Sequence, residues 1–148
     1  MTIRHPLEPR PARLEDDSLD PFHTVFFHAN AGMAISLPDG AFTQVNPSLC
    51  RMLGYAREEM EEMSVFDITH PDDLDRTRSF YEEVSTGKRD QFTYEKRFMR
   101  KDGSFIWGIT TAAWILDSEG APLYCVGMIQ DITRFKEKQE ALLAREKI

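Results

Sequence analysis

The residue types in this sequence that could bind a metal ion gather around one histidine. His70 is followed by Pro71, Asp72 and Asp73, and imidazole and carboxylate groups are common metal ligands. The same run is typical of a helix start, because Thr69 stands three residues before Asp72, as in a capping box, and acidic side chains suit the positive end of a helix. Capping explains these residues without a metal, so we expect no metal site.

Patterns that would support catalysis are absent from the sequence. It contains no glycine-rich phosphate loop, no Gly-x-Ser-x-Gly, no His-Glu-x-x-His and no Cys-x-x-Cys. Adjacent carboxylates such as Glu61–Glu62 and Glu82–Glu83 are typical of solvated helix faces, whereas catalysis needs groups that converge on one cleft. We therefore do not expect an enzyme.

Size and composition favour one globular domain. The chain has 148 residues, of which 41% are hydrophobic and 29% are charged, enough for a single buried core. Its net charge of −7 argues against nucleic acid as a partner, and no apolar run approaches the ~20 residues that span a membrane. The start lacks the apolar region of a signal peptide, and Cys50 and Cys125 lie in apolar surroundings typical of reduced core thiols. We expect a cytoplasmic location.

The N-terminal region divides into an arm and a helix. Residues 1–17 are rich in proline and charge, without apolar periodicity, which predicts a flexible arm. Asp20-Pro21 is typical of a helix N-cap and first position. Apolar residues then follow at the spacing of one helical face: Phe22, Val25, Phe26 and Ala29. This helix covers its own sheet or, with Phe27 as a further aromatic, also contacts a second copy of the chain.

The stretch from Glu95 to Thr133 carries the strongest β-sheet pattern. Turn signals at Asp102-Gly103 and at residues 117–120 divide it into three segments rich in β-formers, which predicts a three-stranded antiparallel meander. A shorter hairpin is predicted upstream, with strands at residues 33–37 and 41–45.

Helices are expected between the hairpin and the meander, and again after it. Asn46 and Pro47 begin a helix that Gly54 ends, residues 57–68 form short helical turns, and a further helix runs to about residue 85. A last helix is predicted over residues 134–148. The 3, 4, 3 spacing of a coiled-coil seam is carried there by Ile132, Phe135, Gln139 and Leu142.

Several motifs in this order resemble those of a PAS domain. They are Asn46-Pro47, Leu53-Gly54-Tyr55, Glu58-Glu59, His70-Pro71-Asp72-Asp73, the run from Arg97 to Gly103, Trp107, Val126-Gly127 and Asp131-Ile132-Thr133. The resemblance covers roughly residues 22–133. It implies an α+β PAS fold, with a five-stranded antiparallel sheet, helices on one face, and flanking N-terminal and C-terminal helices. We expect a PAS domain over 18–133, with its flanking helix, and a C-terminal linker helix over 134–148.

The resemblance also indicates which side chains face a pocket. Similarity to PAS relatives places Cys125, Gly127 and Ile129 toward the helices, and alternation along the strands extends this inward set, which then includes Lys96. The ligand-pocket candidates are Leu53, Phe66, Tyr81, Tyr94, Phe98, Gly108, Thr110, Cys125, Gly127 and Ile129. A mostly apolar set with few polar groups fits a small-molecule site, and it fits a collapsed core equally well.

The opposite face of the meander is too apolar to stand in water. It carries Trp107, Ile109, Ile115, Val126 and Met128, so we expect the N-terminal helix and a partner's copy of it to cover this face. The dimer-contact candidates are Phe22, Val25, Phe26, Phe27, Trp107, Ile109 and Leu142.

Comparison with PAS subfamilies reduces the set of possible cofactors, although the identity of any cofactor stays open. Flavin-binding light-oxygen-voltage relatives carry a reactive cysteine in an Asn-Cys-Arg-type motif, where this chain has the run from Val65 to Thr69, so no covalent flavin adduct is expected. Haem-binding relatives place a histidine on the helix at about residues 73–86, which has none here, so haem is not expected either.

The resemblance implies a sensory input module rather than a catalyst. A ligand or partner would bias the sheet, and the Asp131-Ile132-Thr133 junction would relay that bias to the C-terminal helix and an effector, such as a histidine kinase or a cyclic-dinucleotide enzyme. Asp131 either pairs with a cation such as Arg100 or Lys101 or makes a local bond with Thr133. The alternative function is a ligand-free dimerisation adaptor.

Overall fold

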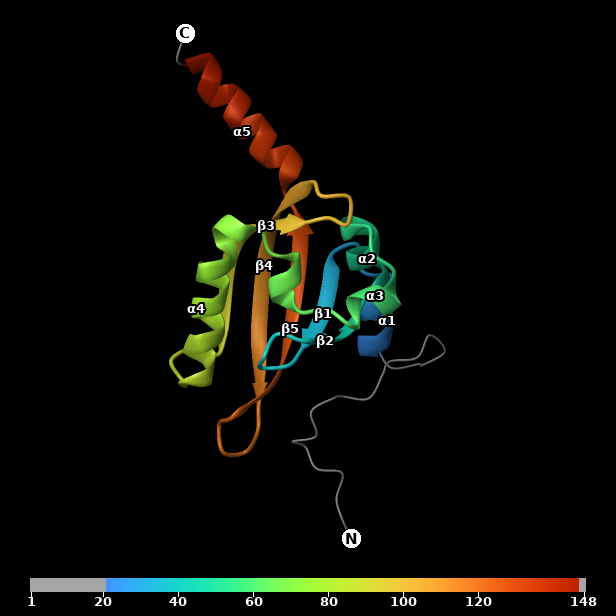
Figure 1. Ribbon diagram of the computed structural model, residues 1–148, viewed down its shortest axis with the longest axis vertical. Helices are drawn as coiled ribbons and strands as arrows, with labels where there is room; N and C mark the ends of the chain where they lie inside the picture. Colours follow the sequence, from blue (N-terminus) through green and yellow to red (C-terminus); the bar gives the residue numbers. More distant parts are fainter. Residues whose placement is uncertain (1–20, 147–148) are drawn as a thin grey trace.

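A single antiparallel sheet forms the centre of the computed structural model, which describes residues 21–146 (Figure 1). Its strands are β1 (Gly32–Ser36), β2 (Phe42–Val45), β3 (Gln91–Met99), β4 (Phe105–Leu116) and β5 (Pro122–Asp131). They lie in the order β2-β1-β5-β4-β3, so the short hairpin joins the long meander where β1 pairs with β5. The predicted α+β fold with five antiparallel strands is confirmed.

The two turns of the meander form as their residues predict. Gly103 has φ 91° and Gly120 has φ 85°, a region that is costly for residues with a Cβ. The preceding aspartates stabilise these turns, since Asp102 Oδ1 accepts from the Ser104 amide at 2.9 Å and Asp117 Oδ1 accepts from the Glu119 amide at 2.8 Å. The meander therefore has tight connections and little freedom of register.

Helices lie on both faces of the sheet, most of them over the inner face, and one extends from its end. They are α1 (Pro21–His28), α2 (Pro47–Leu53), α3 (Arg57–Met60), the 3-10 turns η1 (Val65–Ile68) and η2 (Pro71–Asp73), α4 (Leu74–Ser85) and α5 (Thr133–Glu146). Figure 1 shows α4 beside one edge of the sheet and α2 and α3 toward the other, while α5 projects away from the domain. No helix within residues 21–146 is long and apolar enough to cross a membrane.

Asn46 holds three elements together and begins α2 as predicted. Its Oδ1 accepts from the amides of Leu49 at 3.0 Å and Met33 at 2.8 Å, and its Nδ2 donates to the carbonyl of Phe26 at 2.9 Å. The side chain is fully buried, so these bonds satisfy it within the core. It therefore fixes α1 and β1 relative to α2.

The apolar face of α1 differs from the predicted one. Phe26 is 1% exposed and packs with Met33 and Ile35 of β1, whereas Val25 is 56% exposed and Phe22 is also exposed. The helix has only two turns and is packed on one side, which buries His23 beside Phe26 and leaves Val25 outside. Phe26 belongs to the core of its own chain, so its assignment as a dimer contact was wrong.

The helix start after Thr69 also differs from the prediction. His70 is the cap, because its Nδ1 accepts from the Asp72 amide at 3.1 Å, while the Thr69 hydroxyl donates to the Val65 carbonyl at 2.7 Å. A 3-10 turn separates Thr69 from α4, so the hydroxyl is not in position to cap the helix. Within residues 21–146 no group of three His, Cys, Asp or Glu side chains is placed to hold a metal ion.

Candidate functional site

A small cavity lies between the inner face of the sheet and the helices that cover it. Its volume is about 40 Å³. Its wall is formed by Ala34, Ser36, Phe42, Val65, Ile68, Tyr81, Phe92, Tyr94, Lys96, Phe98, Thr110, Ala112, Cys125, Gly127 and Ile129. The alternation predicted for β3, β4 and β5 therefore brings residues from all three strands to one space, with Ala34 and Ser36 of β1 beside them.

Most of the predicted pocket residues line this cavity. They are Tyr81, Tyr94, Phe98, Thr110, Cys125, Gly127 and Ile129. Gly127 leaves open space, because the nearest atom to a Cβ built there is the Ala34 carbonyl oxygen at 4.0 Å. Whether any of these residues binds a ligand stays a prediction.

Leu53, Phe66 and Gly108 do not line the cavity. Leu53 is buried in the core cluster beneath α2, and Phe66 packs edge-on against the Tyr81 ring at 5.3 Å between centroids. Gly108 leaves no room, because a Cβ built there would lie 2.6 Å from Cε1 of Phe98. Its small size lets the Phe98 ring lie across the sheet and does not create space for a ligand.

Lys96 is the charged residue of the cavity, and the sequence reasoning placed it inward without counting it among the polar groups of the pocket. The side chain is 1% exposed, and its Nζ donates to Thr69 Oγ1 at 2.9 Å and to Thr77 Oγ1 at 3.3 Å. Burial lowers its pKa to about 7, against the opposing attraction of Asp73. The sequence signal that identifies Lys96 as a cavity residue is its position in the alternation of the strand, where every second side chain faces inward.

Lys96 has no anionic partner within residues 21–146. The ion pairs of this region join other side chains. Asp73, the carboxylate whose charge acts on Lys96, is bound by Arg97. Aromatic rings offset part of the cost of burying the Lys96 charge, because Nζ lies 4.8 Å from the Phe98 ring centroid and 5.6 Å from the Tyr94 ring centroid.

The other polar groups of the cavity are neutral at pH 7. Burial raises the pKa of Cys125 and of Tyr94 to about 12 and that of Tyr81 still further. Tyr81 Oη lies 3.3 Å from Ser36 Oγ. Thr110 Oγ1 is buried without a hydrogen-bond partner in the described part of the chain. When Lys96 is protonated, the cavity therefore contains one cation and no protein anion.

Arg97, the next residue on β3, points to the opposite side and binds Asp73. Its Nε and Nη2 donate to Asp73 Oδ2 and Oδ1 at 3.0 and 2.9 Å, and its backbone amide donates to Oδ2 at 2.8 Å. The side-chain bonds to Arg97 hold the pKa of Asp73 below its ordinary value. The guanidinium carbon also lies 5.1 Å from the centroid of Trp107, its cross-strand neighbour on β4.

Trp107 connects β4 to the start of α5. Its amide donates to Thr133 Oγ1 at 3.0 Å, and its carbonyl accepts from the Ile132 amide at 2.8 Å. Lys136 of α5 places its Nζ 4.8 Å from the Trp107 centroid and 2.6 Å from Glu95 Oε1. The first turn of α5 is thus fastened to the outer side of β3 and β4.

Of the two partners considered for Asp131, a nearby cation and Thr133, the structure shows Thr133. Asp131 Oδ1 accepts from the Thr133 amide at 2.9 Å, and Lys101 instead lies 2.7 Å from Glu59 Oε2. Asp131 is exposed, whereas Ile132 and Thr133 are half-buried.

The remaining dimer-contact candidates lie on separate surfaces. Trp107 and Ile109 are half-buried on the outer face of β4, and Leu142 is exposed on α5. Helix α1 packs with Met33, Ile35 and Tyr124 at the β1 side of that face. Cover of the rest of the face by a partner's copy of this helix stays a prediction. Ile115 and Met128 are more than one-third exposed there.

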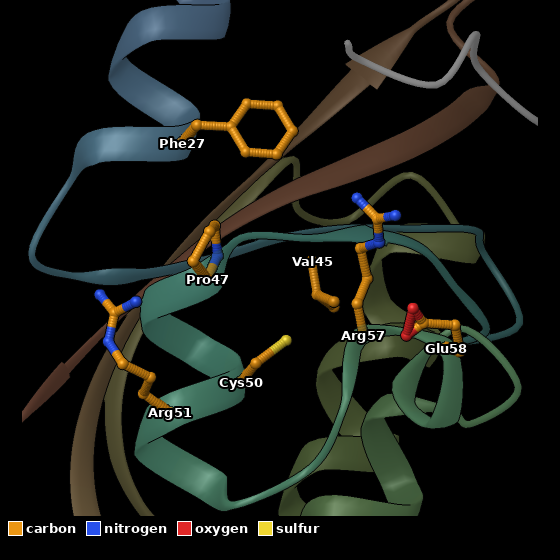
Figure 2. Close-up of a pocket in the computed structure, with 7 residues that line it drawn as sticks. All are labelled: Phe27, Val45, Pro47, Cys50, Arg51, Arg57 and Glu58. Carbon is orange, nitrogen blue, oxygen red and sulfur yellow. The ribbon is translucent and has the colours of Figure 1, made fainter. Parts of the chain in front are cut away.

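A surface groove of about 370 Å³ lies beside α2, where the sequence predicted no site. Figure 2 shows Phe27 of α1 on one side, Cys50 and Arg51 of α2, and Arg57 at the start of α3. Burial raises the pKa of the half-buried Cys50 thiol, so this cysteine is a poor nucleophile at neutral pH. The groove is open to solvent and does not reach the cavity residues described above.

Known proteins resemble this chain in both sequence and fold. The model of the PAS fold matches residues 42–129, more than half of the chain. The probable diguanylate cyclase DgcE of Escherichia coli is 28% identical over 80% of this chain, and sensor protein TdiS of Thauera aromatica is 34% identical over 78%. The matched regions span only 11% and 21% of those two proteins.

A solved structure agrees with these relatives. The sensory box histidine kinase/response regulator from Burkholderia thailandensis matches with a TM-score of 0.67 at 26% identity, covering 86% of this chain and 97% of that one. The family match, the sensor relatives and the five-stranded sheet agree with one another. This chain therefore belongs to the PAS fold family.

Proposed function

We propose that residues 21–146 form a sensory input module, in which a small ligand in the sheet cavity changes how α5 is held. The observation that carries this proposal is the pair Lys96 and Arg97 on β3. Lys96 faces the cavity and Arg97 faces Trp107, the residue to which the start of α5 is bound. One strand thus places a charged group at the ligand position and another at the output position.

Asp73 connects these two positions. It accepts three hydrogen bonds from Arg97, and its negative charge opposes the loss of the Lys96 proton. Thr77, one turn further along α4, accepts from Lys96 Nζ and donates to or accepts from Tyr94 Oη at 3.1 Å. A ligand that moves or neutralises Lys96 would shift the start of α4 and, through Asp73, the guanidinium beside Trp107.

The response requires two packings of α5 against β3 and β4. In the observed packing Lys136 lies on Glu95 and Trp107, and Thr133 accepts from the Trp107 amide. A ligand changes the balance between two packings only as far as it binds one of them more tightly. Helix α5 has no buried residue and exposes Phe135 and Leu142, so a change at its first turn moves an apolar surface.

The proposed effector follows α5. DgcE is named as a probable diguanylate cyclase and TdiS as a sensor protein, and this chain matches a small share of each. By analogy we propose a histidine kinase or a cyclic-dinucleotide enzyme as the effector, with pairing of two copies through α1, the outer face of the sheet and α5. A cytoplasmic location and the absence of a covalent flavin adduct or haem remain predictions.

A ligand-free dimerisation adaptor is favoured by one observation, the size of the cavity. At about 40 Å³ it is far smaller than the roughly 300–1,000 Å³ of sites for drug-sized ligands. Only a very small ligand fits without rearrangement of the helices. An adaptor would need no ligand and would keep α5 in one packing.

Native mass spectrometry of freshly purified protein tests the two functions, run beside the denatured mass and an absorbance spectrum. Hydrogen exchange of the α5 amides, measured with and without ligand, reports whether the packing of α5 responds to the ligand. A retained non-covalent mass, together with ligand-dependent exchange at the start of α5, supports the sensor. Dimers without any retained mass, and with α5 exchange insensitive to small molecules, contradict it and support the adaptor.

A further inference from the structure

We infer that the sheet cavity binds a short-chain monocarboxylate such as acetate, with one carboxylate oxygen on Lys96 Nζ and the other on Thr110 Oγ1. This inference rests on the proposed sensory function, because it names the ligand class of the same cavity. The charge, the unsatisfied donors and the size of the cavity point to this ligand.

The charge of the cavity calls for an anion. Protonated Lys96 is 1% exposed and is bonded only to the neutral hydroxyls of Thr69 and Thr77. An ammonium group has three protons to donate, so one remains without a protein acceptor in the described part of the chain. A buried cation without a counter-charge is costly, and a bound carboxylate would remove that cost.

The charged and titratable groups around Lys96 do not supply the anion. Asp73, before α4, is held by Arg97, and Arg76 of α4 is a further cation that lowers the pKa of Lys96. Tyr94 of β3, Tyr81 of α4 and Cys125 of β5 are neutral at pH 7, because burial raises the pKa of each. A cationic ligand would be repelled.

Thr110 provides a second, independent observation. Its hydroxyl lines the cavity, is buried, and has no hydrogen-bond partner among residues 21–146. Thr110 lies two residues beyond Gly108 on β4, and Gly108 is the cross-strand partner of Lys96. Lys96 and Thr110 are therefore diagonal neighbours on one face of the sheet and line the same cavity, from which we infer that both side chains donate to a single carboxylate.

The volume limits the rest of the ligand. About 40 Å³ accommodates roughly three to four atoms or groups of water size, given about 10–15 Å³ for each, which matches the non-hydrogen atoms of acetate. The wall near Thr110 is apolar and open, because Ile129 is its cross-strand partner and Gly127 leaves space beside Ala34. A methyl group fits this wall, whereas a second charged group would be buried there without a partner.

The test measures acetate binding to the full chain by thermal unfolding, with sodium chloride at equal ionic strength as reference. Acetamide is the neutral ligand of the same shape. Lys96→Met removes the cation and Thr110→Val removes the hydroxyl with little change of volume. The matched controls are Lys88→Met and Thr111→Val, which alter an exposed lysine and the exposed threonine beside Thr110.

We expect acetate, and not acetamide, to raise the melting temperature of the wild type and of both controls. Lys96→Met should weaken acetate binding by at least about tenfold, and Thr110→Val by roughly threefold to tenfold, because each removes a hydrogen bond to a charged group. Wild-type affinity should fall as the pH rises above about 7, where Lys96 loses its proton.

Three results would overturn the inference: an equal effect of acetate on the wild type and on Lys96→Met, an equal effect of acetamide, or no effect of acetate on any variant. Should Lys96→Met fail to fold, Thr110→Val and the pH dependence decide. A larger neutral molecule found by native mass spectrometry would overturn the carboxylate and keep the sensor. Acetate bound without any change in α5 exchange would keep the carboxylate and overturn the proposed relay.

Discussion

Asp73 accepts three hydrogen bonds from Arg97, one from the backbone amide and two from the guanidinium group. The carboxylate lies at the junction of η2 and α4, and the guanidinium lies over Trp107 beside the start of α5. This contact joins the helix that covers the cavity to the strand that holds the output helix. Its loss should affect stability and coupling together.

Asp73→Asn should lower the free energy of unfolding by about 1–3 kcal/mol, because it leaves a partly buried Arg97 with weaker acceptors. The pKa of Asp73 is lowered in the folded protein, so its contribution is complete above the unfolded pKa of about 4 and is lost as the pH falls through the folded value. Between about pH 5 and pH 3 the wild type should therefore lose more stability than Asp73→Asn. Urea unfolding at both pH values measures this difference.

Asp75→Asn is the control for that prediction, because Asp75 is an exposed carboxylate in the same region of α4. It should change stability by no more than about 0.5 kcal/mol. If Asp73→Asn and Asp75→Asn behave alike, the three bonds to Arg97 contribute nothing measurable.

Wild-type stability should rise between pH 7 and about pH 8.5 by roughly 1 to 2 kcal/mol, and Lys96→Met should lack this rise. The folded pKa of Lys96 is about 7 and the unfolded pKa is 10.5, so in this window the unfolded chain binds the extra proton and folding is favoured by added base. Above about pH 9 Cys125 and Tyr94 lower the stability as the pH rises. Burial raises the pKa of both groups, so the unfolded chain releases their protons first. The difference between wild type and Lys96→Met isolates the lysine, and equal slopes would show that Lys96 is not buried as a titrating group.

The two inward glycines of the meander should respond oppositely to alanine. Gly108→Ala should destabilise by about 1–3 kcal/mol, since the new Cβ meets Phe98 at 2.6 Å. Gly127→Ala should be tolerated or slightly stabilising, since its Cβ meets no atom closer than 4.0 Å and alanine is less costly to order. Because it fills the cavity, Gly127→Ala should also abolish acetate binding; unchanged binding would place the ligand elsewhere.

The sheet and its two faces could be predicted from the sequence because they depend on local patterns. Turn aspartates with glycines and period-2 alternation identify β3, β4 and β5, and Asn46 identifies the start of α2. The side chains that line the cavity follow from the same alternation. The positions of Leu53 and Phe66 do not follow from alternation, because they lie in helical segments. A helical pattern does not distinguish a side chain that lines the cavity from one that packs in the core.

Interactions between distant residues could not be predicted. The pairing of Asp73 with Arg97 joins residues 24 positions apart, and that of Lys136 with Glu95 joins a helix to a strand. Neither pair has a fixed spacing in the sequence, so the sequence pattern explains the acidic run after His70 by capping alone. The spacing of one helical face groups Val25 with Phe26, but it does not say how wide the contact on a two-turn helix is, so it does not decide between burial and an exposed position for Val25.

The junction residues should control the output without controlling the fold. Asp131→Ala removes one exposed bond, from the Thr133 amide, and Lys136→Met removes the ion pair to Glu95 and the contact with Trp107. Each should cost no more than about 1 kcal/mol of stability, as exposed caps and surface ion pairs do. Each should nevertheless speed hydrogen exchange of the first turn of α5 and reduce its dependence on ligand.

Lys138→Met is the matched control, because Lys138 is an exposed lysine on the same helix for which the structure shows no ion pair within residues 21–146. It should leave α5 exchange and acetate binding as in the wild type. Lys136→Met should leave acetate binding intact while α5 no longer responds to it, since Lys136 touches the outer side of the sheet and the cavity lies on the inner side. Were Lys136→Met to keep the full ligand-dependent change at α5, the signal would leave the sheet by another route, and Trp107 and Lys136 would serve only to anchor the helix.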